Sequence, residues 1–325
     1  MNRIPLEPPS ISPVSIAEKR LRWSVMIPVY NCAHYLKETL TSVLMQDMGP
    51  AQMQIEVIDD ASTDGDIASL VAEIGQGRVN YFRQPHNVGS LRNFETCLNR
   101  SRGQLIHLLH GDDKVYNGYY KAIASLFDSF PEIGAAFCRH NHIDEIGQFL
   151  GTTNVEAVSE SILSDWLLRL ATIQRIQYSS ITVKREVYEQ LGGFYGVTYG
   201  EDWEMWTRIA HKYPIAYTPT VLAAYRMHST SISTQSLQTG QNLRDLQWVI
   251  GTIQQYLPAN KRNEIKRNSL KKYAHSYLGR ANHEWVKSRN KQIVYAQIKG
   301  CLHMHQDMLL YLKAAYLYSR LLLNY

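Results

Sequence analysis

The sequence predicts an α/β fold in which a mainly parallel central sheet is flanked by helices. Two observations indicate this class: short apolar runs alternate with segments of helical periodicity, and polar residues follow the apolar runs. Strands that alternate with helices form right-handed crossovers, which bring parallel strands together in one sheet. The composition agrees, because 325 residues with 45% hydrophobic and 19% charged side chains are typical of an ordinary globular chain.

The N-terminal half contains the alternation in order. Strands are predicted in the apolar runs WSVMIPVYN (23–31), IEVIDDASTDG (55–65), VNYFRQ (79–84) and QLIHLLHGDD (104–113). Helices are predicted in the segments HYLKETLTSVLMQ (34–46), IASLVAEIG (67–75) and SLRNFETCLNRS (90–101), where apolar residues recur at helical spacing. The chain therefore begins with repeated strand–helix units, and we find no internal sequence repeat.

Acidic pairs close two of these strands. Asp59 and Asp60 end the second run, and Asp112 and Asp113 end the fourth. Ligands bind beyond the carboxyl ends of parallel strands, so these carboxylates are expected at one edge of the sheet. Neither GxGxxG nor GxxxxGK[ST] occurs, and a divalent cation held by carboxylates is then the usual way to neutralise phosphates. The alternative interpretation of each pair is a turn or a helix cap.

Five ordered motifs resemble those of family 2 glycosyltransferases with the GT-A fold. They are SVMIPVYN, IEVIDDASTDG, PHNVGSLRNF, LIHLLHGDD and YGEDWEMWTRI, and the resemblance covers roughly residues 22–232. It implies a nucleotide-sugar-binding α/β domain that transfers a sugar from a nucleotide diphosphate, here expected to be UDP, with inversion at the anomeric carbon. The expected acceptor is a hydroxyl of a saccharide or a lipid-linked molecule in cell-surface polysaccharide or glycolipid synthesis.

The resemblance also assigns residues to the nucleotide. Pro28, Val29 and Tyr30 are expected along the nucleoside, and Asp60 is expected to accept from the imide N–H of a uracil-like base. Arg92 is expected at the base or the diphosphate. The alternatives are core packing for Tyr30 and a solvated surface position for Arg92.

A metal site is implied by the same motifs. Asp112 is expected at the ribose and, with Asp113, at a Mn²⁺ or Mg²⁺ ion. The sequence departs from the commonest family pattern at His110, where the family has Asp. Farther on, AAYRMHSTSIS resembles a segment that closes the active site, so Arg226 and His228 are candidates to reach the diphosphate, with His228 as a metal ligand.

The catalytic base is expected in the segment GEDWEMW. An acceptor hydroxyl attacks well only when its proton is removed as the new bond forms, and the resemblance implies that Asp202 does this, with Glu201 beside it at the nucleotide sugar. Neighbouring carboxylates raise one another's pKa whereas a helix N-terminus lowers it, so the direction is not fixed by the sequence. The alternative is a helix cap before an amphipathic run that contains Trp203 and Trp206.

Three segments are predicted: a flexible proline-rich lead (1–21), the GT-A domain (22–232) and a helical C-terminal extension (233–325). Within the extension, residues 261–291 contain ten basic and two acidic side chains, a local net charge of +8. This basic segment and the Tyr- and Leu-rich end fit either docking on an anionic membrane or an extra helical layer on the catalytic domain.

The remaining features favour a reducing compartment. The four cysteines show no metal-ligand or disulfide spacing, and no apolar run reaches the roughly 18 to 20 residues that a membrane span needs. We therefore expect a cytoplasmic protein, soluble or peripheral on the inner face of the cell membrane, without a nucleic-acid partner. A competing hypothesis is a nucleotide-sugar-binding protein with impaired catalysis, suggested by His110, and a third is a membrane-surface scaffold.

Overall fold

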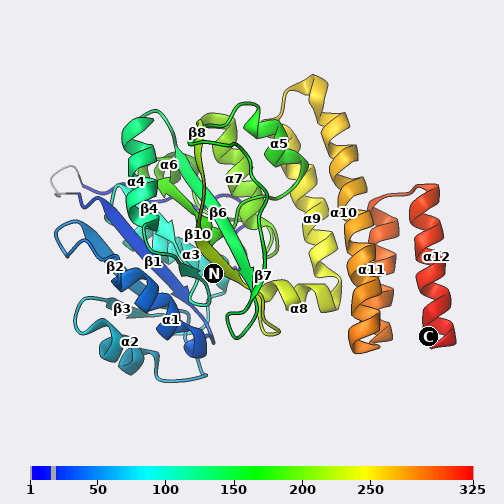
Figure 1. Cartoon of the computed structure of the whole chain (residues 1–325), viewed down its shortest axis with the longest axis horizontal. Helices are drawn as coiled ribbons and strands as arrows, with labels where there is room; N and C mark the ends of the chain where they lie inside the picture. The colour runs from blue at the N-terminus through cyan, green and yellow to red at the C-terminus, as the bar shows by residue number, and fades with distance from the viewer. Residues whose placement is uncertain (1, 16–19, 325) are drawn as a thin grey trace. The chain divides into compact units, whose positions relative to one another are not determined.

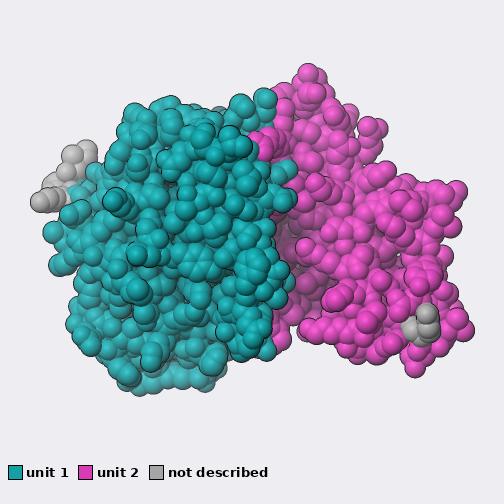
Figure 2. Space-filling model, in the orientation of Figure 1, with its two compact units in different colours: residues 1–166, 175–196, 208–227 teal, residues 167–174, 197–207, 228–325 magenta. Residues whose placement is uncertain are grey.

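The computed structural model describes residues 2–15 and 20–324. The chain divides into two compact units, which Figure 2 shows in different colours. Unit 1 comprises Met1–Trp166, Arg175–Gly196 and Arg208–Met227, and unit 2 comprises Leu167–Gln174, Val197–Thr207 and His228–Tyr325. Unit 2 thus combines the predicted helical extension with two short segments from inside the predicted GT-A domain.

Unit 1 is built around a ten-stranded mixed sheet (Figure 1). The strands are β1 (Trp23–Val29), β2 (Met53–Asp59), β3 (Asn80–Arg83), β4 (Leu105–Leu108), β5 (Lys114–Val115), β6 (Ala135–Ile143), β7 (Phe149–Thr152), β8 (Ser161–Ile162), β9 (Ile181–Lys184) and β10 (Ile215–Arg226). The order is β3-β2-β1-β4-β9-β6-β10-β5, with β7 beside β6 and β8 beside β10. The predicted α/β sheet is confirmed, and its first four strands are parallel. The rest of the sheet is mixed. β9 is antiparallel to both β4 and β6, β7 is antiparallel to β6, and β5 and β8 are antiparallel to β10.

The helices follow the predicted order in the N-terminal half and dominate the C-terminal part. They are α1 (Ala33–Leu44), α2 (Ile67–Gly75), α3 (Ser90–Arg100), α4 (Tyr119–Ser129), α5 (Trp166–Thr172), α6 (Arg185–Leu191), α7 (Glu201–Lys212), α8 (Ile232–Thr239), α9 (Gln241–Thr252), α10 (Ala259–Ser288), α11 (Lys291–Met304) and α12 (Met308–Leu323), with 3₁₀ turns at Tyr178–Ser180 and Ile253–Tyr256. In α1, Leu36, Leu40 and Val43 are completely buried. Burial stabilises the fold by roughly 1.5–3 kcal/mol for each such side chain, so periodicity determines which face of α1 packs inward.

The described part of the N-terminal lead packs within unit 1, although its proline content predicts a flexible segment. Ile11 and Val14 are buried, and the guanidinium of Arg185 donates a hydrogen bond to the carbonyl of Ser12 at 2.7 Å. Apolar side chains next to the prolines make this contact, and the proline-rich composition gave no indication of it. Residues 1 and 16–19 of the predicted lead lie outside the described part of the chain.

The C-terminal helices of unit 2 pack on one another, and α10, α11 and α12 lie side by side in Figure 1. Tyr277 and Trp285 of α10 and Leu317 of α12 are buried. The opposite side of α12 carries exposed apolar side chains, among them Met308, Leu309, Leu312, Tyr316, Leu322 and Leu323. Among the described residues, no helix is both long enough and apolar enough to cross a membrane.

Candidate active site

The ends of β1, β2 and β4 gather at one edge of the sheet, as their parallel pairing requires. Asp60 donates its backbone N–H to the carbonyl of Val29 at 2.8 Å, and Gly111 donates to the carbonyl of Pro28 at 3.1 Å. Tyr30, which follows Val29, has an exposed fraction of 50%. The predicted nucleoside residues of IPVYN therefore adjoin both acidic strand ends, and Tyr30 is not a core residue.

Asp60 holds the loop that precedes α3. Its Oδ1 accepts from the N–H of Val88 at 2.7 Å, and its Oδ2 accepts from the N–H of Gly89 at 3.0 Å. Burial raises the pKa of Asp60, and these two donors act in the opposite direction. Each carboxylate oxygen keeps a second lone pair, so Asp60 can still accept a hydrogen bond from a base as predicted.

Arg92 turns toward the N-terminal lead. Its Nε donates to the carbonyl of Asn2 at 2.9 Å, and its Nη1 pairs with Glu95 at 2.6 Å. Arg92 lines a groove of about 550 Å³ together with Asn87 and Val88. The side chain is thus not a solvated surface arginine, and its predicted role at the donor stays a prediction.

The acidic turn after β4 is fixed from α1. Thr39 Oγ1 is within hydrogen-bond distance of two carbonyls, those of Gly111 at 3.0 Å and Asp113 at 2.7 Å. The buried Asp113 carboxylate accepts from the backbone N–H of Arg226 at 2.8 Å. Burial raises the pKa of Asp113 well above its usual value, and the neighbouring Asp112 adds to this. Two carboxylates in one turn repel, and a cation relieves that repulsion.

His110 lies in an aromatic cluster at the start of this turn. Its ring is 5.1 Å from the centroid of Phe94 and 4.3 Å from that of Tyr178. Burial lowers the pKa of His110, so the imidazole is neutral at pH 7. Its Nε2 is buried and has no hydrogen-bond partner among the described residues. His110, Asp112 and Asp113 each offer one ligand atom, and these atoms lie within 4.8 Å of one another. This donor set fits a Mn²⁺-type ion.

The buried side chain of Arg226 holds the acidic turn in place through hydrogen bonds. Its Nε donates to the carbonyl of Asp112 at 2.8 Å, its Nη1 contacts the carbonyl of Asp144 at 3.2 Å, and its Nη2 pairs with Glu38. The guanidinium is therefore occupied by protein partners. Arg226 was expected to reach a diphosphate, whereas its guanidinium here binds the protein's own groups and has a structural role.

Asp202 lies in the first turn of α7, in unit 2. The helix begins at Glu201, so Asp202 is already helical and is not the residue that caps the helix. Its Oδ2 accepts from Gln174 Nε2 at 2.5 Å, and its Oδ1 accepts from the N–H of Trp203 at 2.7 Å. Burial raises the pKa of Asp202 to about 7, although both donors lower it. Trp203 and Trp206 are core residues, since both are almost completely buried.

The remaining predicted site residues, His228 and Glu201, are also buried and also belong to unit 2. The Nδ1 atom of His228 lies 2.9 Å from Thr230 Oγ1. The roles of His228 at a metal and of Glu201 at the nucleotide sugar stay predictions.

Two positioning residues were missed in the sequence. Thr39 lies at the helical spacing of the apolar residues Leu36 and Val43. A polar residue on the buried face of a helix indicates a hydrogen bond to the interior, so Thr39 could have been found from the sequence. Gln174 belongs to no motif and is found only from its contact with Asp202.

Residues 24–196 match the family described as Glycosyl transferase family 2. The chain belongs to this family. It is similar to an uncharacterized protein of Mycobacterium tuberculosis, with 27% identity over 74% of this chain and 77% of the relative. An uncharacterized glycosyltransferase of Mycoplasma genitalium is 30% identical over 41% of this chain and 46% of the relative, so the match spans less than half of that protein. The minor teichoic acid biosynthesis protein GgaB of Bacillus subtilis is 29% identical over 33% of this chain and 12% of the relative.

Solved structures share the fold. Staphylococcus aureus TarS 1–349 in complex with UDP-GlcNAc superimposes with a TM-score of 0.67 and 16% identity, covering 94% of this chain and 89% of TarS 1–349. The mannosyltransferase PcManGT of Pyrobaculum calidifontis, in complex with GDP-Man and Mn²⁺, gives a TM-score of 0.57 and 16% identity over 98% and 84% of the two chains. The GT-A fold is therefore confirmed.

Proposed function

We propose that this chain is a metal-dependent, inverting glycosyltransferase that moves a sugar from a UDP-sugar to an acceptor hydroxyl. The observation that carries the proposal is the cluster of His110, Asp112 and Asp113 at the end of β4, whose ligand atoms lie within 4.8 Å of one another. It follows a parallel strand, where open α/β sheets bind ligands. The chain has no glycine-rich phosphate loop to serve instead.

The donor follows from the neighbouring strand ends. Pro28, Val29 and Tyr30 would lie along the nucleoside, and Asp60 would accept from an imide N–H with its remaining lone pairs. Arg92 is the candidate for a further contact with the base or the diphosphate. The TarS and PcManGT complexes hold UDP-GlcNAc and GDP-Man respectively. The Asp60 carboxylate suits a base with a ring N–H donor, such as the N3–H of uracil.

Asp112 and Asp113 would hold the divalent ion together with the imidazole of His110, and His228 is a further candidate ligand. Mn²⁺ is present in the PcManGT complex, and Mg²⁺ is the second candidate. When bound, the ion neutralises the charge on the diphosphate leaving group. The protein's own part is to keep the turn rigid, which Thr39 and Arg226 do through hydrogen bonds to its carbonyls.

Asp202 would accept the proton of the attacking hydroxyl. A general base works best when its pKa lies near the operating pH, and burial raises the pKa of Asp202 to about 7. Gln174 and the Trp203 N–H fix the direction of the carboxylate. Attack on the face opposite the leaving diphosphate then inverts the anomeric centre, and Glu201 would contact the donor sugar.

The acceptor is proposed to be a cell-surface saccharide or a lipid-linked intermediate, reached from the cytoplasmic side of the membrane. GgaB is named for teichoic acid biosynthesis, which supports a cell-surface polymer. The exposed apolar side of α12 and the basic segment 261–291 together suit peripheral contact with an anionic membrane.

The experiment is a screen of UDP- and GDP-sugars by thermal shift, with Mn²⁺ and with EDTA, followed by chromatography for released nucleoside diphosphate. Metal-dependent stabilisation with slow donor hydrolysis supports the proposal, because a bound ligand raises stability by RT ln(1 + [L]/Kd). A binding protein without catalysis is the second candidate, favoured by His110 in place of the family Asp. It would bind the donor and release no nucleoside diphosphate.

A further inference from the structure

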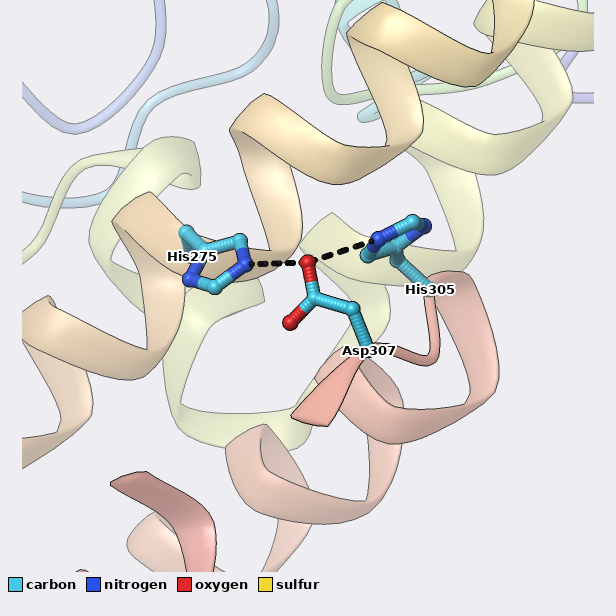
Figure 3. A group of neighbouring side chains, drawn as sticks. All are labelled: His275, His305 and Asp307. Carbon is cyan, nitrogen blue, oxygen red and sulfur yellow. Dashed lines mark hydrogen bonds and ion pairs between the residues drawn. The ribbon is translucent and has the colours of Figure 1, made fainter. Parts of the chain in front are cut away.

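In unit 2, side chains from α10 and from the short connection between α11 and α12 meet around one carboxylate oxygen (Figure 3). His275 lies on α10, His305 directly follows α11, and Asp307 directly precedes α12. The Nε2 atoms of His275 and His305 lie 3.1 and 3.2 Å from Oδ2 of Asp307. The three ligand atoms lie within 4.8 Å of one another, so one small ion can contact all of them.

The carboxylate is held in this direction by the helix that follows it. Oδ1 of Asp307 accepts from the N–H of Leu310 at 2.8 Å and caps the N-terminus of α12. Oδ2 therefore faces the two imidazoles, as both lines in Figure 3 indicate. Hydrogen bonds that orient a ligand in this way are usual around metal sites and raise metal affinity.

We propose that His275, His305 and Asp307 form a binding site for a divalent transition-metal ion of the zinc type. Two imidazole nitrogens and one carboxylate oxygen are preferred zinc ligands, and metal–ligand distances of about 2.0–2.2 Å separate tetrahedral neighbours by roughly 3.3 Å. The observed separations of 3.1 and 3.2 Å match this spacing. The exposed side-chain fractions are 17%, 17% and 23%, so water can supply the fourth ligand. The ion would tie α10, α11 and α12 together.

Lys271 suggests an alternative to a metal site, namely an ion-pair network on Asp307. Its Nζ lies 3.1 Å from the same oxygen of Asp307, one helical turn before His275. An ion-pair network of Lys271 and the two histidines on Asp307 would satisfy these groups without a metal. Lys271 has an exposed side-chain fraction of 57%, so its flexible stem can turn to solvent when a cation enters. The ammonium group and a metal ion compete for one oxygen, and the two interpretations differ in what removal of Lys271 does.

Titration of the metal-free full chain with Co²⁺, followed by its visible absorption and by displacement with Zn²⁺, tests the site. All proteins carry Asp112→Asn, which removes the other candidate metal site. We expect the reference protein and the control His303→Ala, an exposed neighbour, to bind one Co²⁺. His275→Ala and His305→Ala should each weaken binding at least tenfold. Lys271→Met should bind about tenfold tighter, since a competing positive charge is gone.

Equal Co²⁺ affinity in the reference protein and both histidine variants would overturn the site. An affinity of Lys271→Met that is unchanged or lower would also overturn it, because the lysine would then not compete with the ion. Lys271→Met keeps every proposed ligand, so it tests the site even if a histidine variant fails to fold. None of these readouts depends on a sugar donor or acceptor.

Discussion

The substitution Asp202→Asn removes a proton acceptor while it keeps the size and shape of the side chain. Burial raises the pKa of Asp202 from 3.8 to about 7, which corresponds to about 4 kcal/mol, to order of magnitude, against the ionised form. The folded state thus binds this proton more tightly than the unfolded state. Stability falls as pH rises from about 4 to about 7, and the full penalty is present above pH 7.

An uncharged Asn avoids that penalty. It loses one acceptor for Gln174, at about 1 kcal/mol, so the variant should be at least as stable as the wild type at pH 8. Its transfer rate should fall by about 10² to 10⁴, the usual contribution of a general base. The donor Kd should change little, because the base acts only in the transition state.

Three measurements on the Asp202→Asn variant distinguish a catalytic base from a structural residue. They are the transfer rate at saturating donor, the donor Kd by calorimetry, and the melting temperature at pH 8. The control is Glu73→Gln, which removes one exposed carboxylate on α2, outside the proposed site. Near-normal transfer together with a lowered melting temperature would refute the reasoning, because Asp202 would then be a structural residue of α7. The catalytic base would have to be sought elsewhere.

Further outcomes follow from the same structure. The kcat/KM of the wild type should rise with pH and level off above about pH 7 as Asp202 loses its proton, a step that a pH–rate profile of the Asn variant should lack. Arg226→Met should lower stability by about 2 kcal/mol in urea unfolding, whereas an unchanged unfolding midpoint with weaker donor binding would return Arg226 to the diphosphate. Leu312→Glu should reduce flotation with anionic liposomes while Ala68→Glu, an exposed control on α2, should not; equal flotation of both would remove α12 as the membrane contact.

Local periodicity was sufficient for the first half of the fold. Leu36, Leu40 and Val43 mark the buried face of α1 in the sequence, and the alternation of strands and helices predicts the parallel pairing observed among β1, β2, β3 and β4. The order of the strands was not predicted. The antiparallel insertion of β9 was not predictable, since Ile181–Lys184 is a four-residue strand whose partners are distant in the sequence. The same limit applies to the lead, because no helical or strand periodicity around Ile11 predicts that this residue is buried.

For the candidate site, strand ends were predictable because a parallel sheet gathers its carboxyl ends at one edge. That argument placed Asp60, Asp112 and Asp113 correctly at strand ends. It could not give the partners of these groups, such as Arg226, because they come from tertiary packing. The direction of the Asp202 pKa was open for the same reason, since it is set by burial.

Calorimetric titration of UDP tests most directly whether the acidic turn after β4 is a metal-dependent nucleotide site. We predict that the wild type binds UDP at least tenfold more tightly with Mn²⁺ than with EDTA. Asp112→Asn and Asp113→Asn should each abolish that difference while melting cooperatively as folded proteins. Equal UDP affinity with Mn²⁺ and with EDTA in the wild type, or a metal effect that survives in both variants, would contradict the account.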